Sequence, residues 1–170
     1  SFANPSLPNT GVLVLLITEG ESLTSSAAIL DKQVNKSLTR AIKGSRFKGK
    51  GEQALTLMAP EGTNLNRILL IGIGKPKKID ELSMQRAGGN IYASLASTGQ
   101  TAGYILIDSI NNSGLAAPDL AAHIAYGARL RSYRFDKYRT REEANAKPSL
   151  KTLTLISSKS SKARAKFSPL

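Results

Sequence analysis

The sequence predicts an α/β fold, a three-layer sandwich in which a mixed, mostly parallel sheet is flanked by helices. Aliphatic stretches alternate along the chain with segments of helical periodicity, as in strands joined by crossover helices. Aromatic residues make up only 5% of the 170 residues and Trp is absent, so the core must consist mainly of Leu, Ile, Val and Ala. A chain of this length suits one domain.

Five strands are predicted from runs of aliphatic and β-branched residues. They cover residues 11–18 (GVLVLLIT), 53–59 (QALTLMA), 67–73 (RILLIGI), 103–108 (GYILID) and 151–157 (KTLTLIS). The first and third runs are uninterrupted, which is typical of strands covered on both faces inside a sheet. The last run alternates polar and apolar residues and is expected to be a half-buried edge strand.

The first helix is predicted between the first two strands, as one continuous element. Ser25 or Ser26 can cap its start, and Gly44 can end it. Apolar residues recur at every fourth position, as on the buried face of a helix. These residues are Leu30, Val34, Leu38 and Ile42.

Two further helices are predicted, one after the third strand and one after the fourth. The first of them begins at Asp80 or Ser83, and its glycine pair at 88–89 indicates close packing against the sheet, because glycine destabilises a helix interior. The other begins at 118–119 (PD), which suit the first turn of a helix. The apolar stripes are Met84, Ala87, Ile91 and Leu95, then Leu120, Ile124, Gly127 and Leu130.

Positive charge is concentrated in the C-terminal quarter. Residues 129–170 carry a net charge of +9, which leaves +3 of the total +12 for residues 1–128. The candidate residues for binding an anion or nucleic acid are Arg129, Arg131, Arg134, Lys137, Arg139 and Arg141, interleaved with Tyr133, Phe135 and Tyr138. In the alternative interpretation, Tyr133 and Phe135 anchor the end of a helix in the core, and the aliphatic stems of the basic residues cover that surface.

Two glycine-containing segments approach phosphate-binding motifs without completing them. Residues 44–51 (GSRFKGKG) fit G-x-x-x-x-G-K, but Gly51 replaces the required Ser or Thr and the segment follows a predicted helix. Residues 72–75 (GIGK) follow a buried strand, but Lys77 stands where G-x-G-x-x-G needs its last glycine. We expect a flexible basic loop and a tight exit from the sheet, respectively.

No catalytic or metal-binding group of residues is complete in the sequence. His123 is the only histidine, and Asp119 one helical turn before it could contact it, but no nucleophile motif such as G-x-S-x-G occurs. The acidic pairs at 80–81 and 142–143 are adjacent, so their side chains diverge on a helix. Cysteine is absent. We therefore predict no catalytic residue, no metal ligand and no cofactor within this chain.

The remaining segments suggest the location of the protein and the end of its domain. The longest apolar run, at 12–17, is too short to cross a bilayer, and no basic segment precedes it as in a signal peptide. A cytoplasmic protein without a membrane partner is expected. Residues 157–166 (SSKSSKARAK) have no apolar side chain larger than Ala and are predicted to be a solvated linker.

Four motifs, in order along the chain, resemble the N-terminal domain of the leucyl (cytosol) aminopeptidase family. They are Leu30-Asp31, 47–52 (FKGKGE, one residue shorter than F-x-G-x-x-G-E), 67–74 (RILLIGIG), and Gly127 and Leu130 followed by 133–138 (YRFDKY). The resemblance assigns structural roles in this chain to Phe47, Gly49, Glu52, Gly72, Gly74, Gly127, Tyr133, Phe135 and Tyr138.

The resemblance implies a macro-domain-like fold over residues 1–157, with 158–170 as the start of an interdomain linker. It also implies that the full-length enzyme uses two divalent metals (Zn or Mn) to remove N-terminal amino acids, often Leu, and assembles as a homohexamer. The family's metal-binding motif, of the type N-T-D-A-E-G-R-L, belongs to the C-terminal catalytic domain and does not occur here. The expected partner of this domain is therefore its own catalytic domain.

Two functions follow as alternatives. The first is a non-catalytic domain that contributes to oligomer architecture and active-site access. The second is a DNA-binding, regulatory module that uses the basic C-terminal quarter, since some bacterial relatives act as DNA-binding factors. Binding of ADP-ribose, suggested by the macro-domain resemblance, is a weaker third interpretation.

Overall fold

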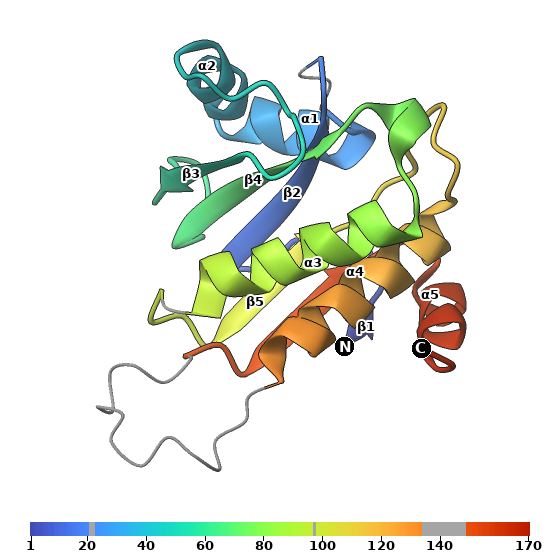
Figure 1. The fold of residues 1–170 in the computed structure, drawn as a ribbon. Helices are drawn as coiled ribbons and strands as arrows, with labels where there is room; N and C mark the ends of the chain where they lie inside the picture. Colours follow the sequence, from blue (N-terminus) through green and yellow to red (C-terminus); the bar gives the residue numbers. More distant parts are fainter. Residues whose placement is uncertain (21–22, 97, 134–148) are drawn as a thin grey trace, which may run out of the picture.

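The six strands of the protein form one sheet with helices on both faces, as seen in a computed structural model that describes residues 1–20, 23–96, 98–133 and 149–170 (Figure 1). The strands are β1 (Phe2–Ala3), β2 (Val12–Thr18), β3 (Ala54–Met58), β4 (Arg67–Gly74), β5 (Ala102–Leu106) and β6 (Thr152–Ile156). Their order is β1-β6-β5-β2-β4-β3, and the β3–β4 pair alone is antiparallel. The mixed, mostly parallel sheet is thereby confirmed.

The helices are α1 (Ser25–Gln33), α2 (Ser37–Lys43), the short 3₁₀ helix η1 (Pro76–Lys78), α3 (Glu81–Ala96), α4 (Ala117–Ser132) and α5 (Ser160–Phe167). Helices α1 and α2 lie on one face of the sheet, and α3, α4 and α5 lie on the other (Figure 1). This arrangement is the predicted three-layer sandwich. No helix within the described residues is long and apolar enough to span a membrane.

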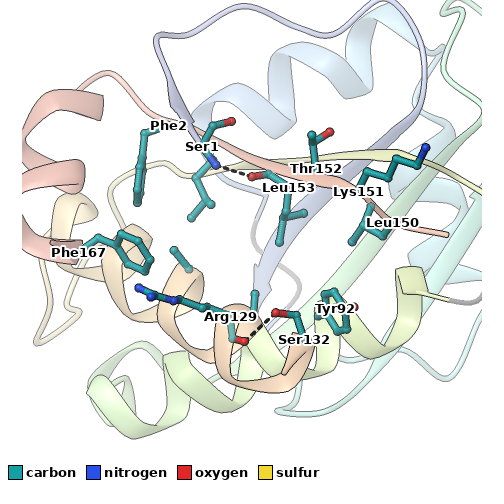
Figure 2. A pocket seen from close by; sticks show the side chains of 13 residues that line it. Ser1, Phe2, Tyr92, Arg129, Ser132, Leu150, Lys151, Thr152, Leu153 and Phe167 are labelled. Atoms are coloured by element: carbon teal, nitrogen blue, oxygen red, sulfur yellow. Dashed lines mark hydrogen bonds between the residues drawn. The ribbon is translucent and has the colours of Figure 1, made fainter. Parts of the chain in front are cut away.

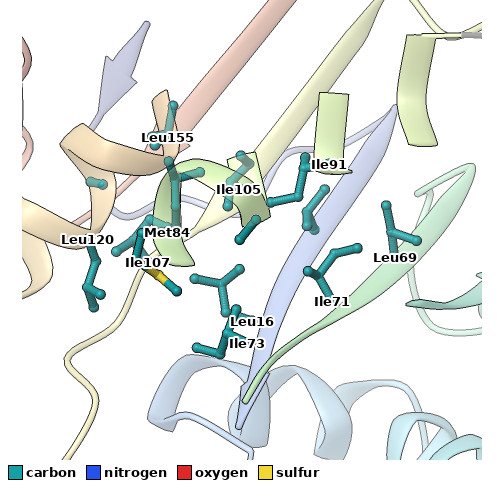
Figure 3. Packing of buried hydrophobic residues seen from close by; sticks show 14 of the residues in the cluster. Leu16, Leu69, Ile71, Ile73, Met84, Ile91, Ile105, Ile107, Leu120 and Leu155 are labelled. Carbon is teal, nitrogen blue, oxygen red and sulfur yellow. The ribbon is translucent and has the colours of Figure 1, made fainter. Parts of the chain in front are cut away.

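The core consists of two clusters, one on each face of the sheet. Alternate residues of β2 divide between them, because successive side chains of a strand point to opposite faces. Val12, Val14 and Leu16 pack beneath α3 and α4, whereas Leu13, Leu15 and Ile17 pack against α1 and α2. Figure 3 shows the first cluster, in which α3 and α4 contribute side chains that meet those of the strands. The labelled members are Leu16, Leu69, Ile71, Ile73, Met84, Ile91, Ile105, Ile107, Leu120 and Leu155.

The prediction that residues 151–157 form an edge strand was wrong. Strand β1 pairs in parallel with the outer side of β6, with Phe2 opposite Leu155 and Ala3 opposite Ile156. β6 therefore lies between β1 and β5, and β1 is the edge. A two-residue strand is too short to produce a periodic pattern, so the sequence carried no signal for it.

The prediction of one continuous helix from residue 25 or 26 to Gly44 was also wrong. Asn35 and Lys36 adopt left-handed backbone angles, with φ of 52° and 58°, and divide the segment into α1 and α2. Asp31 is buried and stabilises the break: its carboxylate accepts hydrogen bonds from the backbone N–H groups of Leu38 (2.9 Å) and Thr39 (3.2 Å), and from the Thr39 hydroxyl. Asp31 thus caps α2 from the preceding helix.

Replacing Asp31 by Ala should lower the free energy of unfolding by about 2 kcal/mol, because two N–H groups at the start of α2 lose their acceptor. Lys32→Ala is the matched control: Lys32 is the exposed neighbour on the same helix, and its truncation should change stability by less than about 0.5 kcal/mol. Urea unfolding of both variants measures the difference. Equal losses would show that Asp31 does not act as a cap.

Helix α3 begins as predicted. The Asp80 carboxylate accepts the backbone N–H of Ser83 at 2.8 Å, and the Ser83 hydroxyl accepts the backbone N–H of Asp80 at 2.9 Å. Hydrogen bonds from Ser83, the backbone N–H foremost, hold the pKa of the Asp80 carboxyl below its ordinary value. This reciprocal pair fixes the start of the helix.

Helices α3 and α4 cross at two glycines. A Cβ atom on Gly127 would overlap the carbonyl oxygen of Gln85 in α3 and lie 2.6 Å from its carbonyl carbon. A Cβ atom on Gly88 would likewise overlap the carbonyl oxygen of Ile124 in α4. The predicted packing of residues 88–89 against the sheet was therefore wrong: Gly88 packs against α4, and Gly89 has only ordinary contacts at 3.8 Å.

Residues expected to form a solvated linker are partly helical. Helix α5 buries Ala163 completely, and the Lys166 ammonium lies 3.1 Å from the Asp119 carboxylate of α4. The Phe167 ring packs against Phe2 of β1, with ring centroids 5.6 Å apart. The helix was missed because these contacts, not an apolar stripe of its own, fix it. The domain boundary near residue 157 stays a prediction.

Candidate functional site

Four of the five parallel strands lead into loops that gather at one edge of the sheet, next to their carboxyl ends. β2, β4, β5 and β6 all end there, so the loops that follow them gather at this edge, where ligands of open α/β sheets commonly bind. The loop at 46–53, before β3, joins the same edge because it packs against Gly72 near the end of β4. Two neighbouring pockets open here, and both are lined in part by Pro76 and Asn112.

The loop at 46–53 is fixed by hydrogen bonds that extend the pairing with β4. The Gly72 N–H donates to the Gln53 carbonyl at 2.8 Å, and the Gly74 N–H donates to the Gly49 carbonyl at 2.9 Å. The Gln53 side chain lies inside the loop, where its Oε1 accepts the backbone N–H groups of Lys48 (2.8 Å) and Lys50 (3.1 Å). Two amides that a phosphate-binding loop would present to a ligand are therefore already bound to the Gln53 side chain.

The glycines of this region permit close backbone contacts. A Cβ atom on Gly49, whose φ is 70°, would overlap the carbonyl oxygen of Thr18 at the end of β2. A Cβ atom on Gly72 would overlap the carbonyl oxygen of Lys50 and lie 2.7 Å from the carbonyl carbon of Gly49. Gly74 has a φ of 82°, and its carbonyl accepts the N–H of Glu19 at 2.8 Å. Loop and strand ends thus form one tightly packed unit.

Five lysines surround the first pocket at this edge. Lys48 and Lys50 come from the loop before β3, whereas Lys75, Lys77 and Lys78 come from the segment at 75–78 that contains η1. The pocket has a volume of about 820 Å³, and Glu19 supplies the one carboxylate among its described lining residues. We call it the lysine pocket. Both segments are visible in the sequence, but no local pattern indicates that they lie together.

The second pocket, of about 550 Å³, lies beside the start of α1 and contains Asp108. The Asp108 carboxylate accepts the backbone N–H of Ser26 at 2.9 Å and the Ser26 hydroxyl at 2.7 Å. A negatively charged side chain thus lies at the N-terminus of α1, where the helix dipole could otherwise hold a phosphate. Repulsion from Asp108 disfavours a diphosphate such as that of ADP-ribose at this position.

The predicted basic segment is only partly described. Arg129, Arg131 and Tyr133 lie at the end of α4, whereas Arg134, Phe135, Lys137, Tyr138, Arg139 and Arg141 lie outside the described residues. Tyr133 is 72% exposed, so it does not anchor the helix in the core. Of the six candidate basic residues, the described part of the chain places only Arg129 and Arg131, both in the last turn of α4.

Arg129 contributes to the packing of α5. Its guanidinium carbon lies 5.9 Å from the centroid of the Phe167 ring. Figure 2 shows Arg129 and Phe167 on one side of a pocket of about 400 Å³, with Phe2, Tyr92 and Leu153 also in its lining. Much of this lining is apolar, and Arg129 is engaged with an aromatic ring, so this part of α4 has the character of a packing contact.

His123 does not contact Asp119, contrary to the contact considered from the sequence. Its buried imidazole contacts two residues of α3. Nε2 lies 3.7 Å from a Glu81 carboxylate oxygen, and Nδ1 lies 3.3 Å from the Gln85 side-chain nitrogen. Asp119 instead pairs with Lys166. His123 therefore links α3 to α4.

The carboxylates with well-defined partners serve structural roles. Asp31, Asp80 and Asp108 accept backbone N–H groups at the starts of α2, α3 and α1, respectively. Within the described residues, no three His, Asp or Glu side chains lie close enough together to hold a metal ion. The donor set in this part of the chain does not fit a two-metal centre.

A family model extends over most of this arrangement. Residues 14–142 match the model described as the cytosol aminopeptidase family, N-terminal domain. The chain belongs to the cytosol aminopeptidase family. The match begins inside β2 and ends after α4, so it includes the loop at 46–53, β4 and the α3–α4 crossing.

Curated members of the cytosol aminopeptidase family are similar over most of this chain. A probable cytosol aminopeptidase of Caulobacter vibrioides is 32% identical over 161 residues, which are 95% of this chain and 31% of the relative. A probable cytosol aminopeptidase of Rhodopseudomonas palustris strain BisA53 is 40% identical over 109 residues, which are 64% of this chain and 21% of the relative. The chain spans at most about a third of the length of these relatives.

Solved structures share the fold of this cytosol aminopeptidase domain. A mutant of tomato leucine aminopeptidase superposes with a TM-score of 0.78 at 21% identity, and the match covers 98% of this chain and 34% of that chain. The macrodomain of Mycobacterium tuberculosis DarG superposes with a TM-score of 0.59 at 11% identity, covering 92% of this chain and 97% of that chain. At these identities the likeness concerns the fold alone, and it confirms the expected macro-domain-like architecture.

Most of the residues that resemble family motifs lie within the described part of the chain. Phe47 is buried in the cluster beneath α1 and α2, and Glu52 is an exposed loop residue with a φ of 69°. Gly49, Gly72 and Gly127 occupy the close backbone contacts described above. Phe47 and these three glycines therefore lie at buried or closely packed positions, whereas Glu52 is exposed.

Gln53, whose side chain organises the loop, was not among the predicted site residues. A glutamine before a strand has no distinctive pattern, so no sequence signal could have found it. The segment at 75–78 (KPKK) was a signal for the lysine pocket, because three lysines follow a strand end directly. Its connection with Lys48 and Lys50 required the structure.

Proposed function

We propose that this chain is the non-catalytic N-terminal domain of a two-metal leucyl aminopeptidase that removes N-terminal amino acids from peptides. The domain contributes to oligomer architecture and to active-site access, and the divalent metals (Zn or Mn) bind to the C-terminal catalytic domain. The full-length protein is a cytoplasmic homohexamer. The observation that carries the proposal is the match of residues 14–142 to the N-terminal domain of the cytosol aminopeptidase family.

Two further observations support the assignment of catalysis to the C-terminal domain and not to this chain. The relatives named as probable cytosol aminopeptidases extend well beyond the part that this chain matches, which covers 31% of the Caulobacter vibrioides protein. Asp31, Asp80 and Asp108 serve as caps of helices. We therefore assign metal-assisted peptide hydrolysis to the portion of the protein that corresponds to the rest of the relatives.

The purified chain should not release ammonia from leucine amide, with or without added Mn²⁺ or Zn²⁺. The full-length protein, produced from the gene that encodes this chain, should be active with the metal and inactive after chelation. Ammonia release measured for both proteins at equal concentration tests the proposal. Metal-dependent turnover by the isolated chain would contradict it, provided that a mock purification is inactive.

The DNA-binding alternative has less support. Arg129, one of the six basic candidates, packs on the Phe167 ring. The net charge of residues 129–170 favours salt-sensitive attraction to any polyanion. Gel shifts at rising salt, with competitor DNA, would distinguish specific binding from simple basicity.

A further inference from the structure

We propose that the lysine pocket binds a compact polyanion through several phosphate groups, such as an inorganic oligophosphate or the triphosphate of a nucleotide. This inference goes beyond the aminopeptidase role and does not depend on it. Its basis is the convergence of two separate basic segments on one concave surface at the carboxyl edge of the sheet.

Four of the five positive charges in the lysine pocket have no ionic partner within the described part of the chain. Lys50, Lys75, Lys77 and Lys78 have no ion pair or side-chain hydrogen bond to any described residue. Glu19 offsets only one of these charges. Ammonium groups of like charge repel one another, and a bound anion with several negative charges converts that repulsion into attraction.

Contacts within the domain hold the backbone that carries these lysines. Gly49 and Gly72 bring the loop against the ends of β2 and β4, and the Gln53 side chain holds the amides of Lys48 and Lys50. Pro76 restricts the start of η1. Anion binding therefore orders lysine side chains and not the backbone, and this lowers the entropic cost of binding.

The dimensions and lining of the pocket indicate the class of ligand. A volume of about 820 Å³ is within the range of small-molecule sites. Lysine is a common phosphate-binding residue that acts as a point charge. No aromatic ring belongs to the described lining, so bases have no surface on which to stack. Recognition should therefore depend on the phosphate chain and not on a nucleobase.

The second pocket, which contains Asp108, supports the placement of the anion in the lysine pocket. Asp108 is held at the start of α1 and repels an anion there, whereas the lysine pocket attracts one. An oligophosphate at this edge is thereby directed toward the segment at 75–78.

Titration of the chain with inorganic tripolyphosphate, monitored by calorimetry at about 150 mM salt, tests the proposal. The variant Lys50→Gln/Lys75→Gln/Lys77→Gln should bind about tenfold more weakly or worse, because three phosphate-binding charges are lost. The matched control, Lys32→Gln/Lys43→Gln/Lys162→Gln, removes the same charge from exposed positions outside the pocket and should change affinity by less than about twofold. ATP should bind within about threefold of tripolyphosphate, since no ring stacks on the base.

Four outcomes would overturn the inference. If tripolyphosphate did not bind, the proposed site would not exist. If both triple variants lost tripolyphosphate affinity equally, the binding would result from the general positive charge of the chain and not from the pocket. Equally strong competition by hexaglutamate would show a pocket for acidic peptide. Much tighter, pocket-dependent binding of oligo-dT would show a nucleic-acid surface. Unfolding curves of the variants confirm that each is folded, and peptidase assays play no part in the outcome.

Discussion

Gly127→Ala should destabilise the domain more than any exposed substitution, by about 2–3 kcal/mol net of the ~1 kcal/mol that alanine contributes within a helix. The added Cβ atom would lie 2.6 Å from the carbonyl carbon of Gln85, which belongs to the backbone of α3. A rotamer change cannot relieve that overlap. Helices α3 and α4 would have to separate, and the side chains they bury beneath them would lose contacts.

Gly89→Ala is the matched control for Gly127→Ala. Gly89 lies at the same helix crossing, but its nearest neighbours would be 3.8 Å from the new methyl group. It should be neutral or stabilising by up to about 1 kcal/mol, because alanine favours the helix. Urea unfolding of both variants and of Gly88→Ala measures the contrast. Similar stabilities for Gly127→Ala and Gly89→Ala would show that the helices do not meet at their backbones.

Gly72→Ala should cost about 3 kcal/mol and also impair the lysine pocket. The new methyl group would overlap the carbonyl of Lys50 and lie 2.7 Å from that of Gly49. The loop at 46–53 would have to move away from β4, and the bond from the Gly72 N–H to the Gln53 carbonyl would break. Tripolyphosphate affinity should fall along with stability.

Gly51→Ala separates this effect from a general intolerance of the loop to substitution. Gly51 lies in the same loop, but a Cβ atom on it would meet nothing within 4 Å. Its stability and its tripolyphosphate affinity should remain close to those of the parent chain. If Gly51→Ala proved as damaging as Gly72→Ala, the close contact between loop and strand would not be the cause.

The layers of the fold could be predicted because the strands carry their own signal. β2 and β4 are continuous aliphatic runs, and such runs fit a sheet that is covered on both faces. The start of α3 was equally visible, since Asp80 and Ser83 form a local pair. Where neighbours in sequence determine the structure, sequence reasoning was sufficient.

Other features depend on residues that are distant in sequence or on contacts without a pattern. The apolar spacing of four continues through Asn35 and Lys36, so nothing in it reveals the break that Asp31 stabilises. Helix α5 is held by partners on β1 and α4. The lysine pocket needs a loop folded back onto β4 by Gln53. Local patterns cannot predict such arrangements.

The contact between Phe2 and Phe167 places the beginning and the end of this chain side by side, as Figure 1 also shows. A short tether between residues 1 and 170 should therefore circularise the polypeptide without stretching the sheet. By the same geometry the unit could be inserted as a cassette into a surface loop of a host protein, entering and leaving at a single corner.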